Sequence, residues 1–202
     1  PAGEAARVRV EESADEEAPA GIGGLAESSS APLPASYDYR KEGRAPRIGN
    51  QGELGTCWAF ASLTALSSSL LPEEDLTFSV DHMTRHNHFQ LEPNEGGEYT
   101  MSMAYLLSWT GPVPEEADPY GDGISPEGLS ACRHVQEIQI LPSKDYEAIK
   151  RAVYLQGGVQ SALYTSMENG MDESPHYNPQ TNAYCYEGPS APNHDSVIIG
   201  WD

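Results

Sequence analysis

A cysteine and the glutamine six positions before it carry the most specific chemical signal in this sequence. Cys57 opens a run with helical periodicity, and the partial positive charge of a helix N-terminus stabilises a thiolate. We therefore expect the pKa of Cys57 to be lowered. Gln51 precedes it across a glycine-containing loop, so its side-chain amide and the backbone N–H of Cys57 can together stabilise an oxyanion. The pair predicts nucleophilic attack on a carbonyl group.

A histidine far downstream can supply the base that such a cysteine needs. His194 lies 137 residues after Cys57 and leads into the apolar run 197–201, which is typical of a buried strand. A rigid strand would hold the ring within hydrogen-bond reach of sulfur. Asp195 follows, but on a regular strand its side chain points to the opposite face. We therefore do not expect Asp195 to orient His194, although its charge would stabilise an imidazolium.

The segment from Gln51 to Phe60, which ends in Cys-Trp-Ala-Phe, resembles the signature of the papain family of cysteine proteases. The Asn-His dipeptide at His194, opening an apolar strand, is similar to the segment that carries the family's base. Two positions depart from the pattern. Leu54 stands where the family usually has a disulfide-bonded cysteine, and Thr56 stands where serine or alanine is commoner. The first of these departures points to a divergent, bacterial branch of the family.

The resemblance implies an α+β fold with two lobes, a helical lobe followed by an antiparallel β lobe that is incomplete at the C-terminus. It makes Cys57 the nucleophile, His194 the base and Gln51 the oxyanion donor of an endopeptidase that forms an acyl-enzyme without metal or cofactor. Gly96 and Gly97 resemble the glycine pair beside which the family binds an extended substrate backbone. The family orients its base with an asparagine on a later strand, and we expect that residue beyond the present chain.

Composition separates the first residues from the rest. Residues 1–34 contain seven acidic side chains against two arginines, and alanine, glycine, serine and proline fill most of the remainder. Such a segment cannot bury enough apolar surface to order itself. We predict a disordered acidic linker or propeptide remnant over residues 1–34 and a truncated papain-like protease domain over residues 35–202.

The overall charge of the chain excludes some classes of binding partner. A formal charge of −20 on 202 residues argues against binding to nucleic acid or to anionic membranes, both of which require a basic face. No apolar run approaches the ~20 residues that span a bilayer, so we expect no membrane insertion. We expect a secreted or cell-surface protein whose partner is a peptide or protein substrate. The sequence does not indicate an oligomeric state.

Hydrophobic periodicity predicts the elements that must position the site. Helical patterns cover residues 56–71, 100–109 and 144–155, with Ser143 as the N-cap of the last. Strand patterns cover residues 135–141, 159–164 and 196–201. Helices that precede most of the strands indicate an α+β arrangement. Cys57 then belongs to the helical part and His194 to the β part, with the substrate cleft between them.

The other cysteines and histidines leave two questions open. If Cys57 is the nucleophile, Cys132 and Cys185 remain as a possible disulfide or as two free thiols, and the sequence does not decide between them. His82 and His86 are spaced to chelate a metal on a helix, but the glutamate of a zinc-protease motif is absent. We interpret them as solvated histidines near a loop and predict no metal site.

Two functions from different classes therefore remain. The favoured one is a cysteine endopeptidase. The alternative is a non-catalytic module of the same fold that binds peptides or cell-surface polymers.

Overall fold

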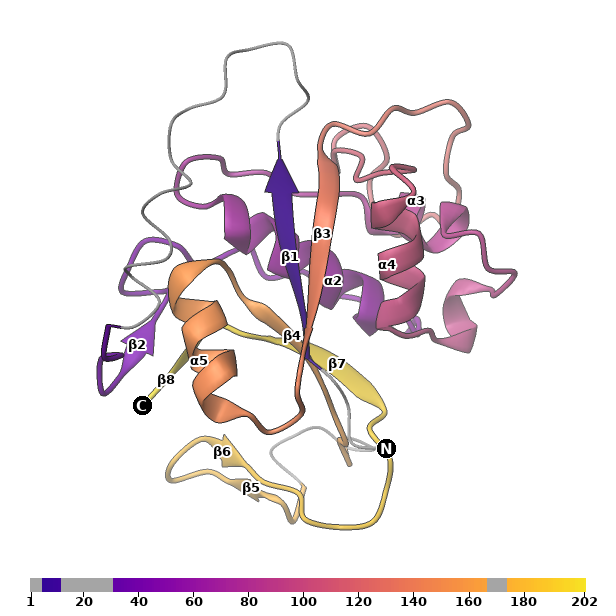
Figure 1. Ribbon diagram of the computed structural model, residues 1–202. Helices are drawn as coiled ribbons and strands as arrows, with labels where there is room; N and C mark the ends of the chain where they lie inside the picture. The colour runs from indigo at the N-terminus through magenta and orange to yellow at the C-terminus, as the bar shows by residue number, and fades with distance from the viewer. Residues whose placement is uncertain (1–4, 12–30, 167–173) are drawn as a thin grey trace.

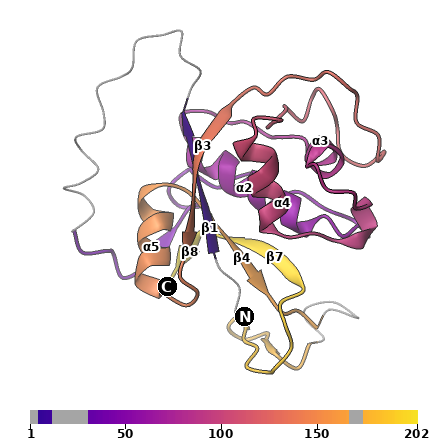
Figure 2. The same cartoon turned by 45° about the vertical axis from the view of Figure 1, so that its right-hand side comes forward.

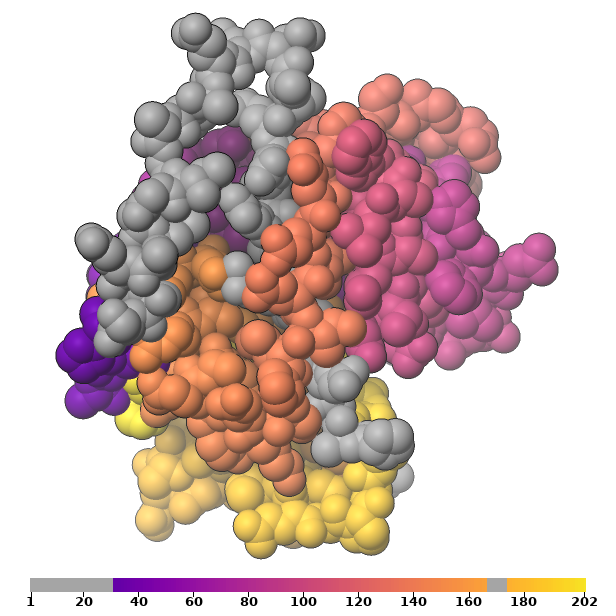
Figure 3. Space-filling model, in the orientation of Figure 1, coloured from indigo at the N-terminus to yellow at the C-terminus, as the bar shows by residue number. Residues whose placement is uncertain are grey.

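The computed structural model describes residues 5–11, 31–166 and 174–202, with side chains from residue 31 onward. Three helices form one side of the molecule: α2 (Cys57–Leu70), α3 (Val80–His86) and α4 (Tyr99–Leu107). The other side holds a four-stranded sheet and α5 (Tyr146–Leu155) (Figure 1). In the space-filling view, the surface of β3 and α5 lies between the helical group and residues 174–202 (Figure 3).

Helix α2 is the central element of the helical group. Its side chains Trp58, Ala59, Leu63 and Leu66 are all buried, and they pack with residues of α3 and α4 in the larger core cluster. The helix ends at Leu70, two residues before Pro72, which cannot continue a helix because it has no N–H to donate. This burial on several faces fixes the N-terminal end of α2, where the predicted nucleophile lies.

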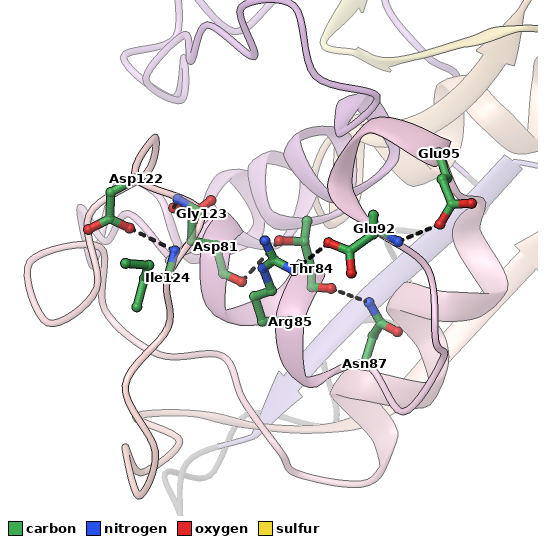
Figure 4. Close-up of polar contacts among 9 residues, drawn as sticks. All are labelled: Asp81, Thr84, Arg85, Asn87, Glu92, Glu95, Asp122, Gly123 and Ile124. Carbon is green, nitrogen blue, oxygen red and sulfur yellow. Dashed lines mark hydrogen bonds and ion pairs between the residues drawn. The ribbon is translucent and has the colours of Figure 1, made fainter.

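Helix α3 anchors the loops around it. Ser79 caps the helix by accepting a hydrogen bond from the His82 N–H at 2.9 Å. Arg85 forms a 2.8 Å ion pair with Glu92, and Glu92 forms a capping box with Glu95 at the ends of η2 (Pro93–Glu95) (Figure 4). The glycine pair at residues 96 and 97 follows η2 directly, so these contacts help to position it.

The main sheet has the order β3-β1-β4-β7. Its strands are β3 (His134–Leu141), β1 (Ala5–Glu11), β4 (Val159–Leu163) and β7 (His194–Ile198) (Figure 2). Strands β4 and β7 are antiparallel, with Leu163 opposite His194. Two short pairs lie outside this sheet, β2 (Tyr37–Asp38) with β8 (Gly200–Trp201) and β5 (Tyr177–Asn178) with β6 (Ala183–Tyr184).

Helix α5 covers the second core. Ile149, Ala152 and Val153 on its buried face pack with Tyr39 and with Val159 of β4. The helix begins later than predicted, because Asp145 rather than Ser143 is the N-cap and accepts a hydrogen bond from Ala148 N–H at 3.0 Å. The helical group has one hydrophobic core, and the β group with α5 has the other. These two cores give the two-lobed α+β architecture predicted from the sequence.

The prediction of disorder for residues 1–34 is wrong for residues 5–11. These residues form β1, which pairs antiparallel with β3 along its length and with β4 at Ala6 and Gln160. Val8 and Val10 alternate with Arg7 and Arg9, and this period of two is typical of a strand. The prediction of disorder gave more weight to the acidic composition of the surrounding residues. Residues 1–4 and 12–30 of the predicted linker lie outside the described residues.

Candidate active site

The predicted nucleophile begins α2. Cys57 is the first residue of the helix, is a free thiol and is partly buried. Thr56 is the N-cap residue, but its side chain makes no capping hydrogen bond. Its hydroxyl instead contacts the Tyr120 hydroxyl at 2.8 Å, and Tyr120 donates to the Gln51 carbonyl at 2.8 Å. Tyr120 therefore ties both ends of the loop that leads to Cys57.

The predicted oxyanion donor is held inside the same loop. The Gln51 side-chain Nε2 donates to the Leu54 carbonyl at 2.7 Å, and this bond fixes the orientation of the amide. Gly52 has φ +61°, in the left-handed region that glycine adopts without strain. Its N–H donates to the Asn50 side chain at 2.9 Å. The short contacts within the loop bring the Gln51 side chain to the wall of the cavity that Cys57 also lines.

The predicted base begins β7. His194 pairs with Leu163 in the β4–β7 ladder. The preceding Asn193 closes the end of this hairpin, since its Oδ1 accepts from Thr165 N–H at 2.7 Å and its Nδ2 donates to the Thr165 carbonyl at 2.9 Å. The strand and the Asn193 contacts together fix the backbone at His194.

One cavity brings the three residues together. It has a volume of about 350 Å³, and Gln51, Cys57 and His194 all line it. Its walls come from the loop before α2, from the first two turns of α2 and from β7. A larger cavity of about 470 Å³ adjoins it and shares part of its wall, including Phe60 and Thr64. The cavity therefore lies between the helix that begins at Cys57 and the strand that carries His194.

The glycine pair lies beside this cavity and does not line it. Gly96 has φ +85°, and its backbone lies so close to Gly55 that a Cβ on Gly55 would meet the Gly96 nitrogen at 2.8 Å. Gly97 packs on the indole of Trp58, where an added Cβ would meet Cε2 at 2.6 Å. Both contacts are one or two residues from Cys57. The glycine pair therefore lies next to the first residues of α2, where Cys57 is.

Asp195 connects the cavity to the helical core. Its carboxylate accepts a hydrogen bond from Gln160 Nε2 at 3.0 Å, and the Gln160 side-chain oxygen Oε1 accepts one from the Ser62 hydroxyl of α2 at 2.6 Å. Burial raises the pKa of Asp195, while the Gln160 hydrogen bond and the positive charge of His194 lower it. The carboxylate is thus turned to β4 and α2.

The expectation that the helix N-terminus lowers the pKa of Cys57 is not met in this structure. Burial is the largest influence and raises that pKa, and the Asp195 carboxylate raises it further because it repels a thiolate. The backbone N–H groups of Asp195, Trp58 and Cys57 favour the thiolate and lower the pKa, but they do not outweigh burial. The helix N-terminus near Cys57 is thus accompanied by a carboxylate from β7, which acts on the thiol in the opposite direction.

The remaining cysteines are free thiols. Cys132 packs against the core of the helical part, whereas Cys185 is exposed just after β6. The interpretation of His82 as solvated is wrong: it is buried, its Nδ1 contacts the Tyr105 hydroxyl at 2.7 Å, and burial lowers its pKa to about 4. Within the described ranges, no three histidine, cysteine or acidic side chains are grouped to hold a metal ion. No helix of the described chain is long and apolar enough to span a membrane.

Sequence reasoning missed several residues that hold the site. Tyr120, Gln160 and Ser62 position the loop and the carboxylate through contacts between segments far apart in the chain. For Tyr120 the only available signal is the Asp-Pro-Tyr-Gly sequence around it, which is typical of a turn. For Gln160 and Ser62 the sequence offers none, because a polar residue in a strand or helix normally faces water.

Comparison with known proteins identifies the family. Residues 33–202 match the model of the papain family cysteine proteases, and the chain belongs to that family. It is 26% identical over 184 residues to pro-cathepsin H of Bos taurus, covering 84% of this chain and 52% of that protein. It is 32% identical over 141 residues to cathepsin K of Gallus gallus, covering 66% of this chain and 41% of that protein. The chain thus spans about half the length of the curated relatives it matches.

A solved structure gives the same fold. The cysteine protease and lectin-like domains of Cwp84, a surface layer associated protein of Clostridium difficile, superpose with a TM-score of 0.70 at 24% identity. The match covers 85% of this chain and 40% of that one. The papain-like α+β fold predicted from the sequence is confirmed.

Proposed function

We propose that this chain carries the catalytic site of a cysteine-type endopeptidase. The observation that supports it is the convergence of Cys57, His194 and Gln51 on one 350 Å³ cavity from two separate parts of the fold. Acyl transfer from a peptide requires a nucleophile, a base and an amide donor, and these three residues supply one of each. Membership of a cysteine protease family agrees with this chemistry.

The proposed reaction has two steps. The Cys57 sulfur attacks the peptide carbonyl carbon, and the proton of the thiol passes to His194. The oxyanion that forms accepts hydrogen bonds from the Gln51 amide and the Cys57 backbone N–H. His194 then gives its proton to the leaving amine as the C–N bond breaks, which leaves an acyl-enzyme thioester. Water, activated by His194, hydrolyses the thioester and releases the acid.

Gly96 and Gly97 are the proposed contact for the substrate backbone on the acyl side of the scissile bond. Two glycines present backbone groups without side chains, so an extended peptide can approach closely and pair with them. Their packing against Gly55 and Trp58 brings that backbone within one or two residues of Cys57. A peptide or protein is therefore the proposed substrate, with no nucleic acid partner and no membrane insertion.

We also propose that the protein works outside the cell or at a bacterial cell surface. The support is the net charge of −20 and the fold shared with Cwp84, itself a surface layer associated protein.

The decisive experiment is Cys57→Ala in the full-length protein. Hydrolysis of an unblocked peptide should fall to the background rate while the far-UV circular dichroism spectrum stays unchanged, because the nucleophile is lost and a small side chain at a helix start is tolerated. Cys132→Ala is the matched control and should keep its turnover. Wild-type turnover in the Cys57→Ala protein would exclude this peptidase mechanism and favour a module that only binds peptides or surface polymers.

A further inference from the structure

One buried side chain joins the helix of the nucleophile to the strand of the base. Gln160 of β4 is 5% exposed, and it contacts residues of both α2 and β7. Its Nε2 lies 3.4 Å from the Trp58 carbonyl and 3.0 Å from the Asp195 carboxylate. Trp58 follows Cys57, and Asp195 follows His194. The two groups that Nε2 contacts therefore each belong to a residue next to a proposed reacting group.

The ladder between β4 and β7 places Gln160 for these contacts. Ala162 lies opposite Asp195, and Gln160 lies opposite Val197. Because residues two apart on a strand point to the same face, Gln160 and Asp195 are diagonal neighbours on one face. Both strands contact α2. The ladder fixes β7 relative to β4, and the side chain of Gln160 adds a polar contact that fixes these two strands relative to α2.

The hydrogen bonds of Gln160 run in one direction. Its Oε1 carries no proton, so the Ser62 hydroxyl, 2.6 Å away, is the donor to it. That hydroxyl has one proton, and the Ser102 hydroxyl of α4 can therefore donate to the Ser62 oxygen, which lies at 2.6 Å. Nε2 of Gln160 in turn donates to Asp195. If the amide were turned over, Oε1 would face the carboxylate, so this chain of hydrogen bonds permits one orientation of Gln160.

The neutral members of this chain of hydrogen bonds are shielded from water. Ser62 is 2% exposed and Ser102 is 3% exposed. A buried polar group is costly to leave unpaired, so each hydrogen bond in the chain supports the next one. The chain therefore connects α4 and α2 to the strand that carries His194.

We propose that Gln160 is a positioning residue that holds the strand of His194 against the helix that begins at Cys57. The inference rests on the proposed peptidase function. Gln160 does not line the cavity, so it acts through its neighbours and touches no reacting atom. Without it, β4 and β7 can move together relative to α2, which changes the distance between the His194 ring and the Cys57 sulfur. Proton transfer requires hydrogen-bond reach, and a displacement of ~1 Å can lower kcat by about 100-fold.

The first test compares two matched serine substitutions in the full-length protein. Ser62 and Ser67 are both buried on α2, and their hydroxyl oxygens lie 2.8 and 2.9 Å from the carbonyl four residues before each. Ser62 also reaches Gln160, whereas the bond of Ser67 stays within the helix. We expect Ser62→Ala to lower kcat by about 10-fold with KM within about 3-fold of wild type, and Ser67→Ala to change neither. Equal kcat values in the two variants, or an effect of Ser62→Ala on KM alone, would overturn the inference.

The second test reverses the hydrogen bond between Gln160 and Asp195. Gln160→Glu removes the donor and sets two carboxylates against each other, so kcat should fall by roughly 10- to 100-fold. Adding Asp195→Asn supplies an amide that donates in the opposite direction and restores the net charge. The double variant, measured at its own pH optimum, should recover to within about 5-fold of the wild-type kcat. A double variant no more active than Gln160→Glu would overturn the inference, and if Gln160→Glu does not fold, the serine pair decides.

Hydrogen exchange separates this inference from the proposed function. Mass spectrometry of peptides that cover residues 194–199 reports how firmly β7 is held, whether or not the protein hydrolyses a substrate. Exchange there should be faster in Ser62→Ala than in wild type or Ser67→Ala, because looser packing on α2 lets the strand open more often. That result in a protein that hydrolyses no peptide would uphold the contact between β7 and α2 and reject the peptidase. An active wild type with unchanged exchange in Ser62→Ala would reject the positioning role.

Discussion

The loop that carries Cys57 and the strand that carries His194 are held by different kinds of contact. Side-chain hydrogen bonds from Tyr120 and from Gln51 itself fix the loop between residues 51 and 56. Strand β7 is fixed by its backbone ladder with β4, to which Asn193 adds a side-chain closure at one end. Backbone pairing is independent of side chains, whereas the loop depends on a few of them. Single substitutions should therefore disturb the nucleophile side more than the base side.

The largest effect after loss of the nucleophile is expected at Gln51. Gln51→Ala removes both the proposed oxyanion donor and the 2.7 Å bond to the Leu54 carbonyl. We expect kcat to fall by roughly 10- to 1000-fold with little change in KM, because an oxyanion donor acts mainly in the transition state. Steady-state kinetics on a peptide substrate would measure it. A change confined to KM would show that Gln51 binds only the ground state.

Tyr120→Phe tests the loop without touching a reacting group. The hydroxyl bonds to the Gln51 carbonyl and to Thr56, so its loss frees both ends of the loop. We expect kcat to fall by about 10-fold, since a small misplacement of a catalytic group is costly, and the free energy of unfolding to fall by about 1–2 kcal/mol. Tyr177→Phe removes a hydroxyl bonded to Asn182, outside the cavity, and should leave kcat unchanged. Equal kinetics in the two variants would contradict the role given to Tyr120.

Asn193→Ala makes the matching change on the base side. It removes the contacts to Thr165 but leaves the ladder between His194 and Leu163. We expect the free energy of unfolding, measured in urea, to fall by about 1–2 kcal/mol. kcat should stay within about 3-fold of wild type, because the backbone pairing that positions His194 remains. If kcat instead fell more than it does in Tyr120→Phe, the difference between the two segments would be the reverse of that inferred here.

The sequence predicted the parts of this site that are local and missed those that are assembled over distance. Helix α2 and strand β3 match their predicted ranges to within one residue at each end, because the signals for them lie within their own residues. Strand β1 was missed because a short alternating run lay inside an acidic segment. The burial of His82 depends on Tyr105, 23 residues away, so the sequence around His82 does not indicate it. The contact between Asp195 and Gln160 likewise joins two strands that the sequence could not place side by side.

The smallest expected effect is a shift in the titration of Cys57. The Asp195 carboxylate repels a thiolate and so raises the pKa of Cys57, whereas the Asp195 backbone N–H favours the thiolate. Asp195→Asn removes the first influence and keeps the second. The pKa of Cys57 should therefore fall, and the pH at which the thiol becomes reactive should fall with it. Because burial is the larger cause and does not change, we expect the pKa of Cys57 to fall only slightly.

The measurement is the rate of alkylation by iodoacetamide as a function of pH, followed on the Cys57 peptide by mass spectrometry. The thiolate is the reactive form, so the rate curve reports its fraction directly. Cys132 serves as the internal reference, and its pKa should not shift. Burial raises the pKa of Cys132, and Asp195 does not contribute to it. Glu187→Gln removes an exposed carboxylate that does not line the cavity, and it should leave the rate curves of both Cys57 and Cys132 unchanged. A Cys57 curve that stayed fixed, or moved to higher pH, in Asp195→Asn would show that Asp195 does not act on the sulfur through its charge. The coupling between the strand and the helix N-terminus would then be carried by the backbone hydrogen bond alone.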